Sequence, residues 1–128
     1  MRTILAMLAG ALMVMTAQAA EYADVKIPDL KAAIAAKTVT LIDANGTASW
    51  KKGHIPGAID FEVNGAKLAD LLPKDKAALI VAYCGGPQCK AYKNAAAAAE
   101  KLGYTNVKHL SAGIHGWEAA GETMEKGN

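Results

Sequence analysis

The sequence predicts an α/β fold: a three-layer, open and mostly parallel five-stranded sheet with helices on both faces. Two observations lead to this prediction. First, short β-branched or apolar segments alternate with helix-forming segments along about 100 residues, the pattern of parallel strands joined by helical crossovers. Second, the most hydrophobic of the strand-like segments, Ala77–Tyr83, runs directly into a glycine-containing loop and then into a long helical segment. The length fits one domain, and no internal repeat is apparent.

The first half of the chain contains three predicted strands and three predicted helices. The strands are Tyr22–Ile27, Val39–Asp43 and the short run Ala58–Ile59. The helices are Leu30–Lys37, Ala48–Lys52 and Ala66–Leu72. Pro28–Asp29 is typical of a helix start, Asn45–Gly46 ends the second strand, and Pro73 closes the third helix.

The second half contains two strands and two helices. They are, in order, Ala77–Tyr83, Lys90–Leu102, Val107–Leu110 and Ile114–Ala120. Alanine is the strongest helix former, so the alanine run supports the longer helix, and Gly103 ends it. Residues 122–128 form a polar tail that we expect to be frayed. Ligands of open α/β sheets bind beyond the carboxyl ends of the strands. Cys84, the residue after the most hydrophobic strand, therefore lies where chemistry is expected.

Residues 1–19 have the organisation of a secretory signal peptide. A positive start at Arg2 precedes the apolar run Ile4–Ala17 and the small-x-small ending Ala17–Gln18–Ala19. A membrane span needs about 20 apolar residues, and this run is shorter. We expect cleavage after Ala19, a periplasmic or secreted location, and one domain over residues 20–128 with no stable membrane association.

The charge balance argues against a nucleic acid partner. Without Arg2, the 14 basic residues become 13 lysines against 12 acidic residues, and the formal net charge falls from +2 to +1. Nucleic acids and anionic membranes are bound by clustered positive charge. The chain after Arg2 contains no arginine, the residue whose planar fork suits phosphate groups best. We therefore expect no nucleic acid partner.

Both cysteines lie in one loop, Cys84–Cys89, between the most hydrophobic strand and the alanine-rich helix. A strand–loop–helix of this kind turns backbone N–H groups inward and points a helix N-terminus at the loop centre, and both favour an anion. The two glycines permit a tight cradle, and the proline stiffens it while removing one donor. Lys90 adds a positive charge. We expect this setting to favour the Cys84 thiolate, the nucleophilic form.

The residues leave four interpretations of the cysteine pair open. Export favours a structural disulfide, although a bond that closes so short a loop constrains little chain. A zinc site would need C-x₂-C spacing and a second ligand pair. A thioredoxin-like redox pair would need C-x-x-C, whereas this spacing is C-x₄-C. A lone nucleophilic Cys84 in an anion cradle fits the loop best.

Three segments together resemble the rhodanese (sulfurtransferase) family. Leu41–Asp43 followed by Trp50–Ile59 (WKKGHIPGAI) is similar to the family's strand end and GHIPGA motif. Leu79–Tyr83 runs into Cys84 and a six-residue loop, as in the family. Leu110–Gly121 (LSAGIHGWEAAG) is similar to the family's closing motif. Their order and spacing cover nearly all of residues 20–128.

The resemblance implies a two-step transfer of sulfane sulfur through Cys84. The thiolate attacks the outer sulfur of a donor such as thiosulfate, and the persulfide passes its sulfur to cyanide or a thiol. The backbone cradle serves as the anion hole, so no histidine base, metal or cofactor is implied. Partners are thus a small sulfur-containing anion and its acceptor, with no protein partner identified. The implied substrate-binding residues are Gly85, Gly86, Gln88, Cys89 and Lys90.

The sequence departs from the family at three places, which bear on the donor more than on the fold. Asn45 stands where many members carry arginine, two residues after the strand-end aspartate. Only Lys90 is close to the loop in sequence, with Lys51 and Lys52 as further candidates for holding the donor. Cys89 takes the last loop position, where threonine, serine or arginine is common, and is a candidate redox partner of Cys84.

Other functions fit the same fold. A persulfide carrier or thiol-redox module would use Cys84 and Cys89 with little turnover. In the redox version, Cys89 attacks the Cys84 persulfide, expels sulfide and leaves a disulfide. Rhodanese-like phosphatases and arsenate reductases use C-x₅-R, and here Lys90, which lacks the bidentate grip of arginine, takes the arginine position. We assign structural, surface or packing roles to the three histidines, His54, His109 and His115.

Overall fold

The structure, a computed structural model, describes residues 22–128; the expected signal peptide 1–19 lies outside the described residues. The strands are β1 (Val39–Asp43), β2 (Ile59–Asp60), β3 (Leu79–Tyr83) and β4 (Val107–His109). The helices are α1 (Ile27–Ala35), α2 (Thr47–Lys52), α3 (Phe61–Asn64), α4 (Leu68–Leu71), α5 (Tyr92–Lys101) and α6 (Gly113–Ala119), with the 3-10 turn η1 (Gly65–Lys67) before α4. Within the described residues, no helix is long and apolar enough to span a bilayer.

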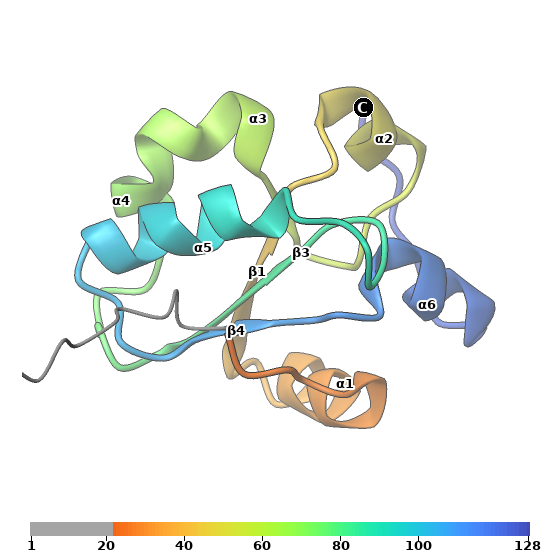
Figure 1. Ribbon diagram of the computed structural model, residues 1–128, viewed down its shortest axis with the longest axis horizontal. Coiled ribbons are helices and arrows are strands. Elements are labelled where there is room, and N and C mark those ends of the chain that lie inside the picture. The colour runs from red at the N-terminus through yellow and green to blue at the C-terminus, as the bar shows by residue number, and fades with distance from the viewer. Residues whose placement is uncertain (1–21) are drawn as a thin grey trace, which may run out of the picture.

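The strands form one parallel sheet in the order β2-β1-β3-β4, with α1 on one side and α3, α4 and α5 on the other (Figure 1). The prediction of a parallel α/β sheet is confirmed, but the sheet in the described residues has four strands, not five. The predicted first strand, 22–27, reduces to a single parallel bridge between Asp24 and His109. Pro28 sits in the first turn of α1, which already begins at Ile27, so few extended residues remain to pair with β4.

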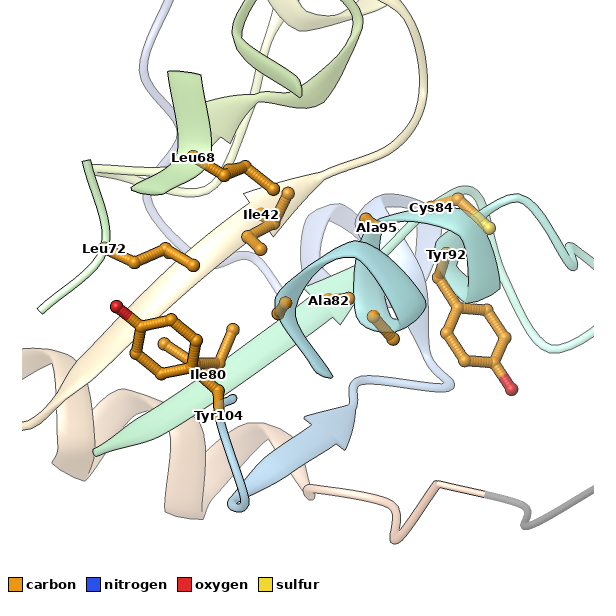
Figure 2. Close-up of a cluster of buried hydrophobic side chains, with 11 residues drawn as sticks. Ile42, Leu68, Leu72, Ile80, Ala82, Cys84, Tyr92, Ala95 and Tyr104 are labelled. Carbon is orange, nitrogen blue, oxygen red and sulfur yellow. The ribbon is translucent and has the colours of Figure 1, made fainter. Parts of the chain in front are cut away.

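Alternate residues of β3 face two separate cores, as expected for a strand buried on both sides. Ile80, Ala82 and Cys84 pack against α4 and α5, and Val81 and Tyr83 pack against α1 and α6. Figure 2 shows the first core between α5 and the sheet, with Cys84 at one end and Tyr104 at the other. The three-layer prediction is therefore confirmed.

The boundaries of most other elements lie within two residues of the predicted ones, and the remaining large differences surround Asp60. Helix α3 has no counterpart in the prediction, and the predicted helix 66–72 is split into η1 and α4. The Asp60 carboxylate accepts a hydrogen bond of 3.1 Å from Glu62 N–H and another of 2.7 Å from the Thr47 hydroxyl. The first of these bonds caps α3, and the second is a tertiary contact that no local pattern reveals.

The polar tail, 122–128, is attached to the domain and not frayed as predicted. His54 and Glu125 form an antiparallel bridge through hydrogen bonds of 2.8 and 2.9 Å between their backbone groups. The Trp117 indole N–H also donates to the Thr123 carbonyl at 2.8 Å. Through these bonds the backbone of the tail gains hydrogen-bond partners in the domain, which a solvated tail would lack. The tail therefore forms part of the domain.

Candidate functional site

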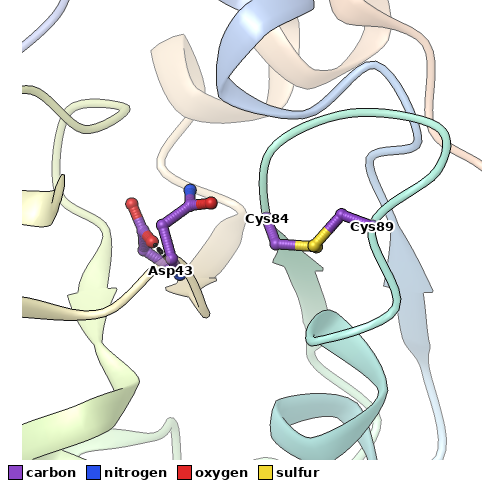
Figure 3. The surroundings of a disulfide bond; sticks show 4 residues. Asp43, Cys84 and Cys89 are labelled. Atoms are coloured by element: carbon purple, nitrogen blue, oxygen red, sulfur yellow. Dashed lines mark hydrogen bonds between the residues drawn. A yellow bond between two sulfur atoms is a disulfide. The ribbon is translucent and has the colours of Figure 1, made fainter.

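Cys84 directly follows β3 and is joined to Cys89 by a disulfide bond (Figure 3). The loop brings the two Cα atoms to 6.2 Å because it turns back on itself, with Cys89 N–H donating to Gly86 O at 3.0 Å. The lone Cys84 thiolate favoured by the loop sequence is therefore not the state of this structure. Sequence spacing alone did not decide between a free and a bonded pair.

Helix α6 holds the cysteine loop from one side. Ile114 N–H donates to the Cys84 carbonyl at 2.9 Å, and His115 N–H donates to the Gly85 carbonyl at 3.0 Å. A trans peptide places its C=O and N–H on opposite sides, so the N–H groups of Gly85 and Gly86 face away from α6. Within residues 22–128, neither of these two N–H groups donates a hydrogen bond. They are therefore available to an anion, whereas Cys89 N–H is already used.

Gly113 lets α6 approach the loop this closely. Its φ is +62°, and a Cβ built on it would lie 2.5 Å from both C and O of Gly85. Real Cβ atoms do not approach backbone this closely, and L side chains rarely adopt this φ. The glycine of the closing motif is therefore needed for contact between α6 and the cysteine loop.

Asp43 braces the same end of the sheet. Its fully buried carboxylate accepts hydrogen bonds of 2.7 Å from Asn45 N–H and from the Tyr83 hydroxyl, which itself accepts from Ile55 N–H at 3.1 Å. Burial raises the pKa of Asp43, and burial together with the Asp43 charge raises the pKa of Tyr83. Tyr83 therefore stays a neutral donor. The network ties the ends of β1 and β3 to the GHIPGA segment, so Asp43 has a structural role here.

The predicted site residues differ in how close they lie to Cys84. Gly85 and Gly86 are half-buried next to it, whereas Gln88 and Lys90 are exposed on the outer part of the loop. Cys89 is half-buried and bonded to Cys84. The further candidates Lys51 and Lys52 are exposed at the end of α2.

Two residues beside the loop were not assigned to the site from the sequence. A Cβ built on Gly85 would lie 3.5 Å from Cε1 of His115 and 3.9 Å from Oδ1 of Asn45. His115 lies on α6, inside the closing motif, and Asn45 lies in the turn after β1. In the sequence, the only indication that position 45 belongs to the site is the arginine that many family members have there. The sequence gives no such indication for His115.

His54 has the structural role predicted for it. Its buried ring stacks on Trp50 with centroids 4.0 Å apart, and its Nδ1–H donates to the Trp50 carbonyl at 2.8 Å. Trp50 in turn donates its indole N–H to the Ala58 carbonyl at 2.9 Å. This histidine therefore stabilises the GHIPGA turn.

The fold and the loop define a class: a single parallel α/β domain with a cysteine loop beyond the end of a central strand. A family model described as "Rhodanese-like domain" matches residues 26–120, most of the chain. The chain therefore belongs to the rhodanese-like family, which confirms the resemblance found in the sequence.

A curated relative is the HTH-type transcriptional regulator Rv0324 of Mycobacterium tuberculosis, 38% identical over 92 residues. The match covers 70% of this chain but only 38% of the regulator, so the chain spans less than half of that relative's length.

Solved structures share the fold. The BH2092 protein of Bacillus halodurans is 27% identical with a TM-score of 0.65, and the match covers 82% of this chain and 77% of that one. A human single-domain sulfurtransferase is 24% identical with a TM-score of 0.60, over 75% of this chain and 95% of that one. A thiosulfate sulfurtransferase from Pseudomonas aeruginosa is 22% identical with a TM-score of 0.64, over 84% of this chain and 21% of that one. At these identities the two sulfurtransferases bear on the fold alone.

Proposed function

We propose that the protein is a sulfurtransferase that carries sulfane sulfur on Cys84, from thiosulfate or a similar donor to cyanide or a thiol. Membership of the rhodanese-like family supports a sulfurtransferase-type or persulfide-related role. The observation that carries the proposal is the position of Cys84 at the end of β3, beside the N–H groups of Gly85 and Gly86, which donate no hydrogen bond within the described residues. These groups suit the negative charge of a bound persulfide.

The proposed reaction has two displacement steps. In the reduced protein, the Cys84 thiolate attacks the outer sulfur of thiosulfate, the donor's S–S bond breaks, and sulfite leaves with the electron pair. Cys84 then carries a persulfide anion. Cyanide attacks the terminal sulfur, the persulfide S–S bond breaks, thiocyanate forms, and the thiolate returns. Each step conserves charge without an external oxidant or reductant.

The disulfide favours a second candidate function, a thiol-redox module or persulfide carrier. A disulfide is the product expected if Cys89 attacks the inner sulfur of a Cys84 persulfide and hydrosulfide leaves. The two functions share the first step, loading of Cys84, and differ in the fate of the loaded sulfur. An enzyme turns over thiocyanate continuously, whereas a carrier or redox module loads once and then waits for its acceptor or reductant.

Intact-mass analysis tests the proposal. The reduced protein, treated with thiosulfate, should gain the mass of one sulfur atom, and the gain should disappear in Cys84→Ser. Loading together with continuous formation of thiocyanate from thiosulfate and cyanide supports the enzyme, and loading with negligible turnover supports the carrier. No adduct on Cys84 with thiosulfate, a polysulfide or a small persulfide would overturn both.

We also propose that the protein is exported to the periplasm or the exterior. The proposal rests on the sequence of residues 1–19, with its positive start, apolar run and small-residue cleavage site. Expression of the full chain followed by cell fractionation and N-terminal sequencing tests it. A mature N-terminus at Ala20 in the exported fraction is expected, and a cytoplasmic protein that retains Met1 would overturn it.

A further inference from the structure

The two sulfurs of the disulfide differ in how accessible they are. Cys84 is 1% exposed and packs in the core under α5, whereas Cys89 is half-buried in the outer loop. Of the two, Cys89 lines a pocket of about 320 Å³ on the outer side of the loop. Thiol–disulfide exchange requires a thiolate to reach one sulfur atom directly. The pocket therefore gives such a thiolate access to Cys89 and not to Cys84.

The charges around the pocket favour an anion. Two lysines line the pocket: Lys90 at the end of the loop and Lys93 in the first turn of α5. The carboxylate in its wall, Asp24, is already engaged, because it accepts hydrogen bonds of 2.8 Å from the Lys26 ammonium and from Ser111 N–H. Lys90 and Lys93, by contrast, form no salt bridge with any of the described residues, so their positive charges are available to an anion.

The size and walls of the pocket favour a small ligand. Its volume is at the low end for small-molecule sites, which start at about 300 Å³. Tyr22, Tyr92 and His109 supply ring surface; His109 stacks on Tyr92 with centroids 3.3 Å apart at the back of the pocket. Burial lowers the pKa of His109, so this wall stays neutral and does not add to the charge of the lysines.

We propose that this pocket binds a small anionic thiol, which opens the disulfide by attacking Sγ of Cys89. The attacking thiolate forms a mixed disulfide with Cys89, the Cys84–Cys89 bond breaks, and Cys84 leaves as a thiolate. A second thiol then attacks the mixed disulfide, which releases Cys89 as a thiolate and the two small thiols as their disulfide. The protein gains two electrons, and the two thiols lose them.

The reducing step rests on the proposed function, because the thiolate that it releases, Cys84, is the one that accepts sulfane sulfur. Gly85 and Gly86 directly follow Cys84, and their N–H groups, which donate no hydrogen bond within the described residues, are available to the new thiolate. A more stable thiolate is the better leaving group. Access and leaving-group stability therefore select the same direction of attack.

The test locates the first adduct without any sulfur donor, so it is independent of the persulfide assay. The oxidised protein is mixed briefly with 2-mercaptoethanesulfonate, then quenched in a denaturing, mildly acidic buffer that contains N-ethylmaleimide. Both cysteines fall in one tryptic peptide, residues 77–90. Tandem mass spectrometry should place the mercaptoethanesulfonate on Cys89 and the maleimide on Cys84. The reverse distribution would overturn the proposal.

The rates test the role of the lysines. At low salt, 2-mercaptoethanesulfonate should open the disulfide several-fold faster than cationic cysteamine, once both rates are corrected for thiolate content and for a small model disulfide. Lys90→Gln combined with Lys93→Gln should remove this preference, as should high salt. Lys67→Gln combined with Lys101→Gln removes the same two positive charges from exposed residues that do not line the pocket, and should keep the preference. Equal corrected rates for the two thiols in the wild-type protein would contradict the anionic pocket.

Discussion

The Tyr83 hydroxyl donates a hydrogen bond of 2.7 Å to the Asp43 carboxylate, and both side chains are fully buried. Because Tyr83 is the residue before Cys84, this bond fixes the end of β3 on the face opposite to the cysteine. The bond joins β1 to β3 at the point where their register pairs Asp43 with Tyr83. A carboxylate buried in this way makes the stability of the fold depend on pH.

The Asp43→Asn variant should become more stable relative to the wild type as the pH rises. Burial raises the pKa of Asp43 above 3.8 in the folded state, so folding favours its protonated form. The stability that this group contributes is present below pH 3.8 and is lost as the pH rises through the raised pKa. Asparagine does not titrate. Urea unfolding of both proteins from acidic to neutral pH measures the difference, and a difference that does not change with pH would contradict the shift.

Gly113→Ala should destabilise the protein more than Gly121→Ala does. Both glycines have positive φ, +62° and +73°, but a Cβ on Gly121 meets nothing within 4 Å. We expect Gly121→Ala to cost about 1 kcal/mol from backbone strain alone. Gly113→Ala adds the collision with Gly85, for a total of about 3 kcal/mol. Urea unfolding measures both; equal losses would show that α6 can yield without disturbing the loop.

Cys89→Ser should accept sulfur from thiosulfate without prior reduction. The variant cannot form the Cys84–Cys89 disulfide, so Cys84 stays available as a thiolate, whereas the oxidised wild type has none to offer. Intact-mass analysis without reductant should show the sulfur adduct in the variant and not in the wild type. After reduction, the two proteins should load at rates within about threefold of each other, since a hydroxyl replaces the thiol with little change in size. Loading of the oxidised wild type at the rate of the reduced one would count against a disulfide that blocks Cys84.

Asn45→Arg should lower the KM for thiosulfate. Asn45 lies beside Gly85, and its backbone N–H, which any residue at this position keeps, donates to the Asp43 carboxylate. A guanidinium there would add a charged fork next to the loop amides. A tenfold fall in KM would correspond to about 1.4 kcal/mol of added binding. Steady-state thiocyanate formation measures KM, Asn45→Gln serves as the uncharged control, and the effect should shrink in high salt. An unchanged KM would place the donor away from Asn45.

The position of Cys84 could be predicted because two independent patterns agree on it. The apolar, β-branched segment Leu79–Tyr83 is long enough to be a buried strand, and the loop after it begins with glycines. The surroundings of the loop could not be predicted in the same way. Asn45 and His115 reach Gly85 through tertiary contacts between distant segments, which leave no periodic signal.

The differences in the fold have the same physical origin. The tail looked frayed because its residues are polar, yet the backbone of Glu125 pairs with that of His54, and backbone pairing depends little on side-chain type. The first strand looked extended by its alternation, but the proline in the first turn of α1 shortens it. The oxidation state of the two cysteines depends on the redox conditions around the protein as well as on the spacing of the cysteines in the sequence.

The disulfide spans five positions, whereas Gly113 and the rest of α6 follow only after α5 and β4. During synthesis, the ribosome therefore delivers both cysteines before the helix that shapes their loop. Contacts across so few residues form within about 100 ns, so the two sulfurs meet repeatedly in the nascent chain. The encounter of the two sulfurs needs none of the later fold, so an oxidant that meets the unfolded chain can join them before the helix that shapes their loop is in place.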